Sequence, residues 1–222
     1  MQGRQVEELQ AYQRMEEFIR RNAAHLGTIP NTLPRRNIVA AIKAVTDAFA
    51  AQARTERMRQ SLTEQKHYLR EALRREMGPL IAQPQATSMA PELENMRNLR
   101  FPPIRIDDMT LIGEARALRK MAARHEAVFI RCGRKRNFLE HLDGMIAALE
   151  ECIMTRDGER VEHRRQTIVV VTELKRARFN RDLLTAMMKE QLREPRPDLL
   201  KAWMAATRMR QKPGPKRKRA SS

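Results

Sequence analysis

The spacing of apolar residues between 35 and 82 constrains the fold of this chain more than any other feature. Large apolar residues follow one another there at steps of four and three: Ile38, Ile42, Val45 and Phe49. This spacing places side chains on one face of a helix and is typical of coiled coils. The stripe resumes at Met58, and an unbroken helix would be roughly 70 Å long. We therefore expect a long amphipathic helix from about 35 to 82, ended or kinked by Gly78-Pro79.

Similar spacing predicts three further long helices and a short one. We expect the long ones at about 3–25, 108–154 and 159–193, and the short one after Asp198, with Trp203 as an anchor on the bundle. Asp107 or Asp108 is a suitable N-cap for the helix that ends near 154. Gly133 and Gly144 would allow a bend within that helix. The turn signal Thr155-Arg156-Asp157-Gly158 predicts that the next helix folds back antiparallel.

Composition agrees with a helical protein. The chain is 41% hydrophobic, 32% charged and only 4% aromatic, with eight glycines in 222 residues, a profile typical of helical bundles. The segment 167–172 is rich in β-branched residues, but helical sequence flanks it on both sides, so we predict helix there as well. The predicted fold is an all-α, elongated antiparallel bundle of about four long helices and a short C-terminal helix, with a disordered basic tail.

Proline and charge divide the chain into segments. Residues 1–83 are predicted to form an N-terminal helical hairpin, and 84–108, with four prolines, a connection. Residues 109–210 are predicted to form a second hairpin with the short docking helix, in one bundle with 1–83. The tail, 211–222, has the composition of a disordered segment.

The two cysteines and the apolar runs bear on location. Cys132 and Cys152 are twenty residues apart in the predicted third helix, which would separate their Cα atoms by roughly 30 Å. A disulfide tolerates about 7 Å at most. We therefore expect free thiols and, with no apolar signal sequence at the start, a cytoplasmic protein; the basic tail would allow a nuclear location in a eukaryote. The most apolar stretch, 38–53, is too short and too charged to span a bilayer.

The net charge of +17 favours polyanionic partners such as nucleic acid. Residues 194–222 contribute the largest share, with nine basic and two acidic residues. The tail and the residues just before it supply seven candidate nucleic-acid contacts: Arg208, Arg210, Lys212, Lys216, Arg217, Lys218 and Arg219. Such an arm can neutralise phosphates without sequence preference, although a merely solubilising tail is an equal alternative.

A second basic cluster lies around Gly133. It contains four candidate contacts: Arg131, Arg134, Lys135 and Arg136. If the chain reversed at 155–158, residue 134 would lie opposite about residue 179, and this cluster would merge with the basic residues of 175–181. The alternative, which we favour for these helices, is a solvated face balanced by nearby glutamates.

Catalytic and cofactor-binding patterns are weak. Glu64–His67 is one Glu-x-x-His pair where a di-metal bundle site needs two and further glutamates. His125 and Cys132 fall on one helical face, but mid-helix burial would not activate a thiol. Glycine-rich phosphate loops, Gly-x-Ser-x-Gly, Cys-x-x-Cys and His-Glu-x-x-His do not occur. We predict no metal, no cofactor and no catalytic residue.

Three functions follow as hypotheses. The first is a non-enzymatic interaction or scaffold protein that binds a protein partner or a second copy through its helices. The alternative is a sequence-tolerant nucleic-acid-binding accessory protein that acts through the tail and the 131–136 cluster. An enzyme or metalloprotein is the third, and it would need inward-facing carboxylates and histidines.

Overall fold

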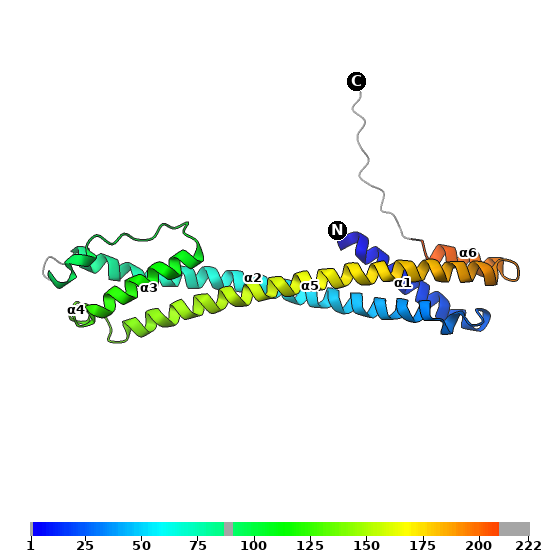
Figure 1. Ribbon diagram of the computed structural model, residues 1–222, viewed down its shortest axis with the longest axis horizontal. Coiled ribbons are helices and arrows are strands. Elements are labelled where there is room, and N and C mark those ends of the chain that lie inside the picture. Colours follow the sequence, from blue (N-terminus) through cyan, green and yellow to red (C-terminus); the bar gives the residue numbers. More distant parts are fainter. Residues whose placement is uncertain (1, 87–90, 209–222) are drawn as a thin grey trace, which may run out of the picture. The chain divides into compact units, whose positions relative to one another are not determined.

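The protein is all-α, as its sequence predicts. The computed structural model describes residues 2–86 and 91–208. Across these residues it has α-helices and short 3₁₀ helices and no strand (Figure 1). The α-helices are α1 (Gln2–Arg21), α2 (Leu33–Ala86), α3 (Asp108–Arg124), α4 (Glu126–Arg131), α5 (Phe138–Leu192) and α6 (Pro197–Ala206). The 3₁₀ helices are η1 (Ala23–His25), η2 (Ile29–Asn31) and η3 (Pro91–Met96).

The chain folds into two compact units. Unit 1 consists of Met1–Arg54 and His163–Ser222, and unit 2 of Thr55–Glu162. Helices α1 and α6 belong to unit 1, and α3 and α4 to unit 2. Helices α2 and α5 each contribute one part to unit 1 and the other to unit 2. Each unit has its own hydrophobic core.

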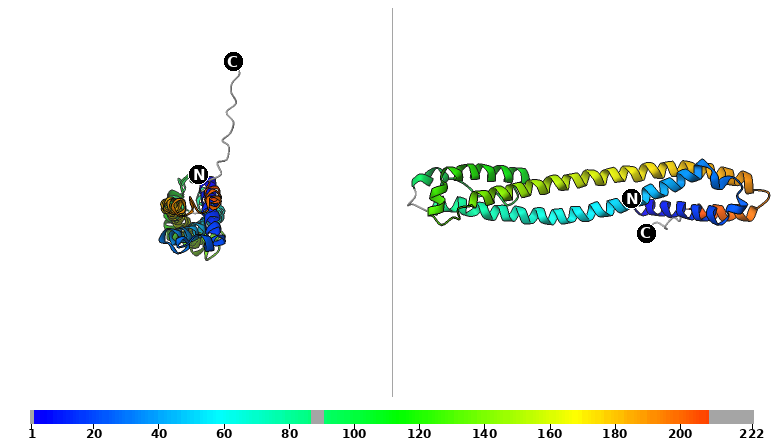
Figure 2. Two further views of the ribbon diagram at one scale, coloured as in Figure 1. Left: turned by 90° about the vertical axis from the view of Figure 1, so that its right-hand side faces the viewer. Right: turned by 90° about the horizontal axis from the view of Figure 1, so that it is seen from below.

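The core of unit 1 forms between α1, α2, α5 and α6. Trp203 of α6 is fully buried, and its ring lies 5.6 Å from that of Phe18 in α1, measured between centroids. Its Nε1 donates a hydrogen bond to Thr185 Oγ1 of α5 at 3.3 Å. Helix α6 consequently lies beside α1 (Figures 1 and 2), which confirms that Trp203 anchors the short helix.

An ion pair with one buried partner, Glu8, joins the two chain segments of unit 1. Glu8 of α1 is 1% exposed. It accepts hydrogen bonds from Arg178 Nε and Nη2 at 2.5 and 2.7 Å and from the Tyr12 hydroxyl at 2.8 Å. Burial, together with the hydrogen bond to Glu8, raises the pKa of Tyr12 above its ordinary value. The carboxylate thus has charged and neutral donors that offset its burial.

The core of unit 2 forms between α2, η3, α3, α4 and α5. The rings of Phe129 in α4 and Phe138 in α5 lie 5.8 Å apart between centroids. Helices α3 and α5 are antiparallel, because Arg116 bonds Glu150 whereas Arg119, further along α3, bonds Asp143, which lies earlier in α5.

The prediction of one continuous helix from 108 to 154 is wrong. Helix α3 ends at Arg124, and the chain reverses between α4 and α5. Gly133 has φ +92°, a backbone conformation that costs glycine little and other residues much more. The expected bend at Gly133 is therefore a complete break, whereas Gly144 lies within α5.

The predicted turn at 155–158 is also wrong, because these residues lie inside α5. A single glycine costs a helix only about 1 kcal/mol relative to alanine. Buried residues on both sides of Gly158, such as Leu149 and Val170, favour one continuous helix. The juxtaposition of residues 134 and 179 that depended on this turn is wrong as well.

Helix α2 runs past its predicted end. It continues through Gly78-Pro79 to Ala86 and contains Pro79 and Pro84. Proline removes a backbone donor, but the burial of Met77 and Leu80, each 1% exposed, offsets that loss.

Three local predictions are confirmed. The β-branched segment 167–172 is helical, within α5. Asp107 is the N-cap of α3, and its Oδ1 accepts the backbone N–H of Thr110 at 2.9 Å. Both cysteines are free, although Cys132 follows α4 rather than sharing a helix with Cys152.

Candidate nucleic-acid interface

Positive charge is divided unequally between the two units. Unit 1, including the tail, has 25 Lys and Arg against 10 Asp and Glu, a net charge of +15. Unit 2 has 19 against 17, a net charge of +2. The described residues of unit 1 alone have 19 against 10, a net charge of +9. Unit 1 therefore has a clear excess of positive charge even without the tail.

The predicted tail contacts fall mostly outside the described residues. Arg208 is described, is exposed, and its carbonyl accepts a hydrogen bond from Arg14 Nη2 of α1 at 3.1 Å. That bond attaches the last described residue to α1. The other predicted contacts lie beyond the described part of the chain: Arg210, Lys212, Lys216, Arg217, Lys218 and Arg219.

The predicted cluster at 131–136 lies between α4 and α5 in unit 2. Arg131, Lys135 and Arg136 are exposed. Arg134 is half-buried, and its Nη2 donates to the carbonyl of Glu76 in α2 at 3.3 Å. Arg134 therefore helps to attach this loop to α2, and the cluster belongs to the unit with the smaller net charge.

The sequence indicates basic residues at 175–181, but sequence reasoning did not recognise a row of unpaired cations along α5 in unit 1. Three exposed residues of α5 form no ion pair among the described side chains: Arg164, Lys175 and Lys189. They are 11 and 14 residues apart, close to whole numbers of turns at 3.6 residues per turn, so they share one face. The spacing of these cations is visible in the sequence, but the sequence does not show which Lys and Arg residues form ion pairs.

Neighbouring cations in the same helix are engaged in structural contacts. Arg178 pairs with the buried Glu8, and Arg176 donates to Asn37 Oδ1 of α2 at 3.3 Å. Hydrogen bonding to Glu8 raises the pKa of Arg178, so its charge is held firmly. Among the basic residues predicted at 175–181, Lys175 is the one that forms no ion pair with a described side chain.

Apolar side chains lie among the cations of this face. Ile168 and Phe179 are each 66% exposed, and Val171 and Leu183 are each 40% exposed. Exposed residues of this size in one helix mark a contact surface when they gather on one side. We call this set of three cations and four apolar residues the α5 face.

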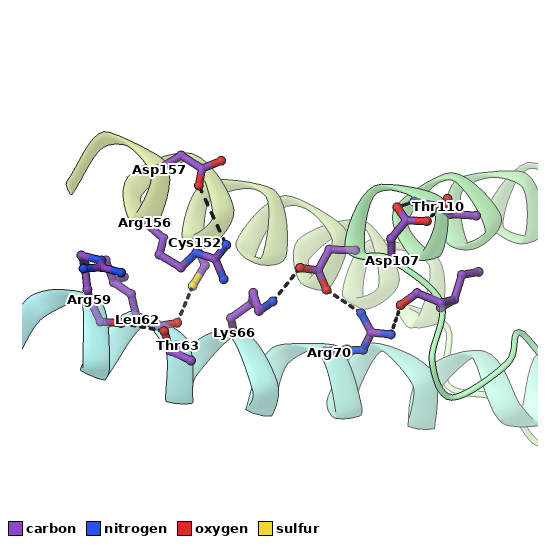
Figure 3. Close-up of polar contacts among 12 residues, drawn as sticks. Arg59, Leu62, Thr63, Lys66, Arg70, Asp107, Thr110, Cys152, Arg156 and Asp157 are labelled. Atoms are coloured by element: carbon purple, nitrogen blue, oxygen red, sulfur yellow. Dashed lines mark hydrogen bonds and ion pairs between the residues drawn. The ribbon is translucent and has the colours of Figure 1, made fainter. Parts of the chain in front are cut away.

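A compact polar cluster in unit 2 provides a contrast, because its charges are satisfied internally. Lys66 and Arg70 of α2 reach toward the start of α3 (Figure 3). They bond the two carboxylate oxygens of Asp108 at 2.7 and 2.5 Å, and Arg70 also bonds the carbonyls of Ile104 and Ile106. Burial pushes the pKa of Asp108 upward, but the bonds from Lys66 and Arg70 outweigh it and leave the pKa below its ordinary value. The cluster attaches the connection before α3 to α2.

Cys152 lies beside this cluster, and its surroundings do not activate the thiol. It is 4% exposed, and its Sγ donates to the carbonyl of Leu62 at 3.4 Å (Figure 3). Burial raises the pKa of the thiol, against smaller opposing effects of Arg156 and Lys66. A neutral, buried thiol is a poor nucleophile and a poor metal ligand.

The other residues considered for chemistry are dispersed. His125 lies between α3 and α4 and is half-buried, and Glu64 and His67 are exposed on α2. Over residues 2–86 and 91–208, no group of three or more His, Cys, Asp or Glu side chains is arranged to hold a metal ion.

Among the helices of the described chain, none is both long enough and apolar enough to cross a membrane.

Comparison with known proteins does not extend these observations. No protein-family model, no curated protein and no solved structure matches the chain.

Proposed function

We propose that the protein is a non-enzymatic, sequence-tolerant nucleic-acid-binding accessory protein. The observation that carries this proposal is the charge of +15 on unit 1 and its tail, against +2 on unit 2. A phosphate backbone releases counterions when Lys and Arg neutralise it, and this release supplies most of the affinity of non-specific binding.

Sequence tolerance follows from the kind of contact available. The α5 face offers charged ends and apolar side chains on a convex helix. Contacts to phosphate position a nucleic acid without reading its bases, whereas specificity needs several side chains directed at base edges. The tail, 211–222, has five Lys and Arg and no acidic residue, and basic runs of this kind commonly bind nucleic acid.

The experiment removes equal charge from the two units. In one full-length variant, the six cations of 210–219 become Gln: Arg210, Lys212, Lys216, Arg217, Lys218 and Arg219. The matched control replaces six exposed unit 2 cations that form no ion pair among the described residues: Arg57, Arg75, Arg97, Lys120, Arg124 and Arg160. Binding of fluorescein-labelled oligo-dT is followed by anisotropy between about 50 and 200 mM salt, the range over which such binding falls steeply.

The tail variant should bind much more weakly, with a salt slope reduced by about 0.7 for each phosphate that is no longer neutralised. The unit 2 variant should keep most of the affinity and most of the slope. Equal reductions in both variants would show that total charge matters and its placement does not. No salt-sensitive binding by the unmodified protein would refute the proposal itself.

A second function, protein interaction through unit 2, is favoured by one observation. A surface groove of about 720 Å³ is lined by Glu71, Arg74, Arg75, Gly78, Phe101 and Ile104. Ile104 is 78% exposed and Phe101 43% exposed, and the Arg74 guanidinium lies 4.8 Å from the centre of the Phe101 ring. The small net charge of unit 2 would let two copies approach without strong repulsion.

Light scattering after size-exclusion chromatography tests the self-association part of this second proposal. Concentration-dependent dimers that Ile104→Ser abolishes would support it. A monomer at high concentration would exclude self-association as the use of this groove.

A further inference from the structure

We propose that the α5 face binds single-stranded nucleic acid, with Phe179 stacking on an unpaired base and Lys175 bonding the adjacent phosphate. This inference rests on the proposed function, and it names the folded surface and the form of nucleic acid.

The cations of the face are arranged as a track. Arg164 and Lys189 mark its ends, and Lys175 lies between them on the same side of α5. The distance from the first to the last is roughly 38 Å at 1.5 Å per residue. Asp182 lies on this side too, midway between Lys175 and Lys189, but Arg181 pairs with it at 2.7 Å. A single strand laid along the helix would therefore meet a positive charge at several points. Because the three cations form no ion pair among the described residues, binding would not require an existing contact to break.

Phe179 is placed to add a contact of a different kind. It is 66% exposed, so its ring is available on the surface of α5. Lys175 precedes it by four residues, one helical turn, on the same side. Aromatic rings beside a basic track are the common means of binding single strands, since every base has a face on which a ring can stack.

Duplex nucleic acid would not use this arrangement. In a duplex each base is already stacked on its neighbours, so a ring on a convex helix finds no free base. The phosphates of a duplex would still attract the cations. The expected preference for single strands therefore depends on Phe179, whereas the general affinity depends on the cations.

A docked protein helix fits the face less well. Such a helix needs apolar anchors at successive turns. From Val171, the position one turn on is Lys175, and Phe179 follows one turn later. The apolar row is thus interrupted at its centre, which suits an alternation of phosphates and bases better than a continuous apolar stripe.

The test uses full-length variants of Phe179 with two probes, fluorescein-labelled oligo-dT and a duplex of the same length. Phe179→Ala should weaken oligo-dT binding by about fivefold or more, because stacking contributes at least about a factor of five per base. Phe179→Tyr, which keeps the ring, should bind within twofold of the unmodified protein, and Phe179→Leu should behave like Phe179→Ala. Leu183→Ala removes another exposed apolar residue of the face and is the matched control, with little expected change.

The two probes separate this inference from the proposed function. Duplex binding should change less than twofold in Phe179→Ala, while Lys175→Gln with Lys189→Gln should weaken both probes. If Phe179→Ala binds oligo-dT as tightly as the unmodified protein, or loses duplex binding equally, the stacking contact is refuted and the charge-based function stands. Full affinity of Phe179→Leu for oligo-dT would also refute the stacking contact, because it would show that an apolar side chain without a ring suffices. Failure of the unmodified protein to bind either probe would refute the function as well.

Discussion

Replacing Asp108 with asparagine tests how much the polar cluster of unit 2 contributes to stability. The side chains of Lys66, Arg70 and Asp108 are 14, 13 and 20% exposed. The asparagine would keep the shape and one acceptor but would leave two poorly solvated cations without their counter-charge. Removing one partner of a fully buried pair costs about 3–5 kcal/mol, whereas exposed pairs contribute about 1 kcal/mol or less. For a pair of intermediate exposure we expect Asp108→Asn to lower the free energy of unfolding by about 2–3 kcal/mol.

The matched control is Asp143→Asn, in the same unit. Asp143 accepts three hydrogen bonds from Arg119, but the two side chains are 48 and 39% exposed. This substitution should cost less than about 1 kcal/mol. Urea unfolding followed by circular dichroism measures both variants. Equal destabilisation by the two would refute the argument that burial, rather than the number of hydrogen bonds, sets the contribution.

The effect should also depend on pH with a definite sign. Because the folded-state pKa of Asp108 lies below its ordinary value, its stabilising effect is complete above the unfolded pKa of about 3.9. It is lost as pH falls through the lower folded-state pKa. The difference between the unmodified protein and Asp108→Asn should therefore shrink in acid, and a difference that stays constant down to acid unfolding would contradict the ion-pair account.

Three further predictions concern packing, backbone and thiol chemistry. Trp203→Ala should cost about 3–5 kcal/mol and release α6, seen as faster proteolysis near residue 196 with little change in the amide exchange of unit 2. Gly133→Ala should destabilise by about 1 kcal/mol or more, because φ is +92° there although an added Cβ would meet no atom within 4 Å. Gly113 also has free space for a Cβ, but it lies inside α3, so Gly113→Ala should stabilise the protein by about 0.5–1 kcal/mol. A change in stability of the same sign in both glycine variants, measured by thermal unfolding, would refute the backbone argument. With a thiol reagent near neutral pH, the half-buried Cys132 should react before Cys152, which is buried and has a raised pKa, and the reverse order in single-cysteine variants would contradict this burial.

Helix type was predictable from this sequence because the apolar spacing is regular over long stretches. Helix ends were less so, since Asp157-Gly158 and Gly78-Pro79 have the residues of a turn or stop and yet lie within α5 and α2. Packing on a neighbouring helix outweighs the roughly 1 kcal/mol that a glycine costs, and that packing is not visible in a local window. Gly133 stops a helix because it adopts a positive φ, which the residue type permits but does not require.

The candidate interface was predictable only in its charge. The tail and the 131–136 cluster are obvious as runs of Lys and Arg, but Arg134 proves to bond the Glu76 carbonyl. Lys175 and Arg178 look equivalent in the sequence, and only the position of Glu8, 170 residues from Arg178, distinguishes them. Contacts between residues so far apart in the chain decide which cations remain open to a partner.

The division of α2 and α5 between the units bears on how the chain reaches its native state. Unit 2 is one uninterrupted stretch, whereas unit 1 needs both ends of the chain. During synthesis from the ribosome, unit 2 is complete while Arg178, the partner of Glu8, has yet to emerge. The contact between Leu62 and Cys152 spans 90 residues, and the Glu8–Arg178 pair spans 170. Prior folding of unit 2 roughly halves the loop that unit 1 must close and lowers its entropic cost by about 0.6 kcal/mol, so we expect unit 2 to fold first and unit 1 to assemble after it.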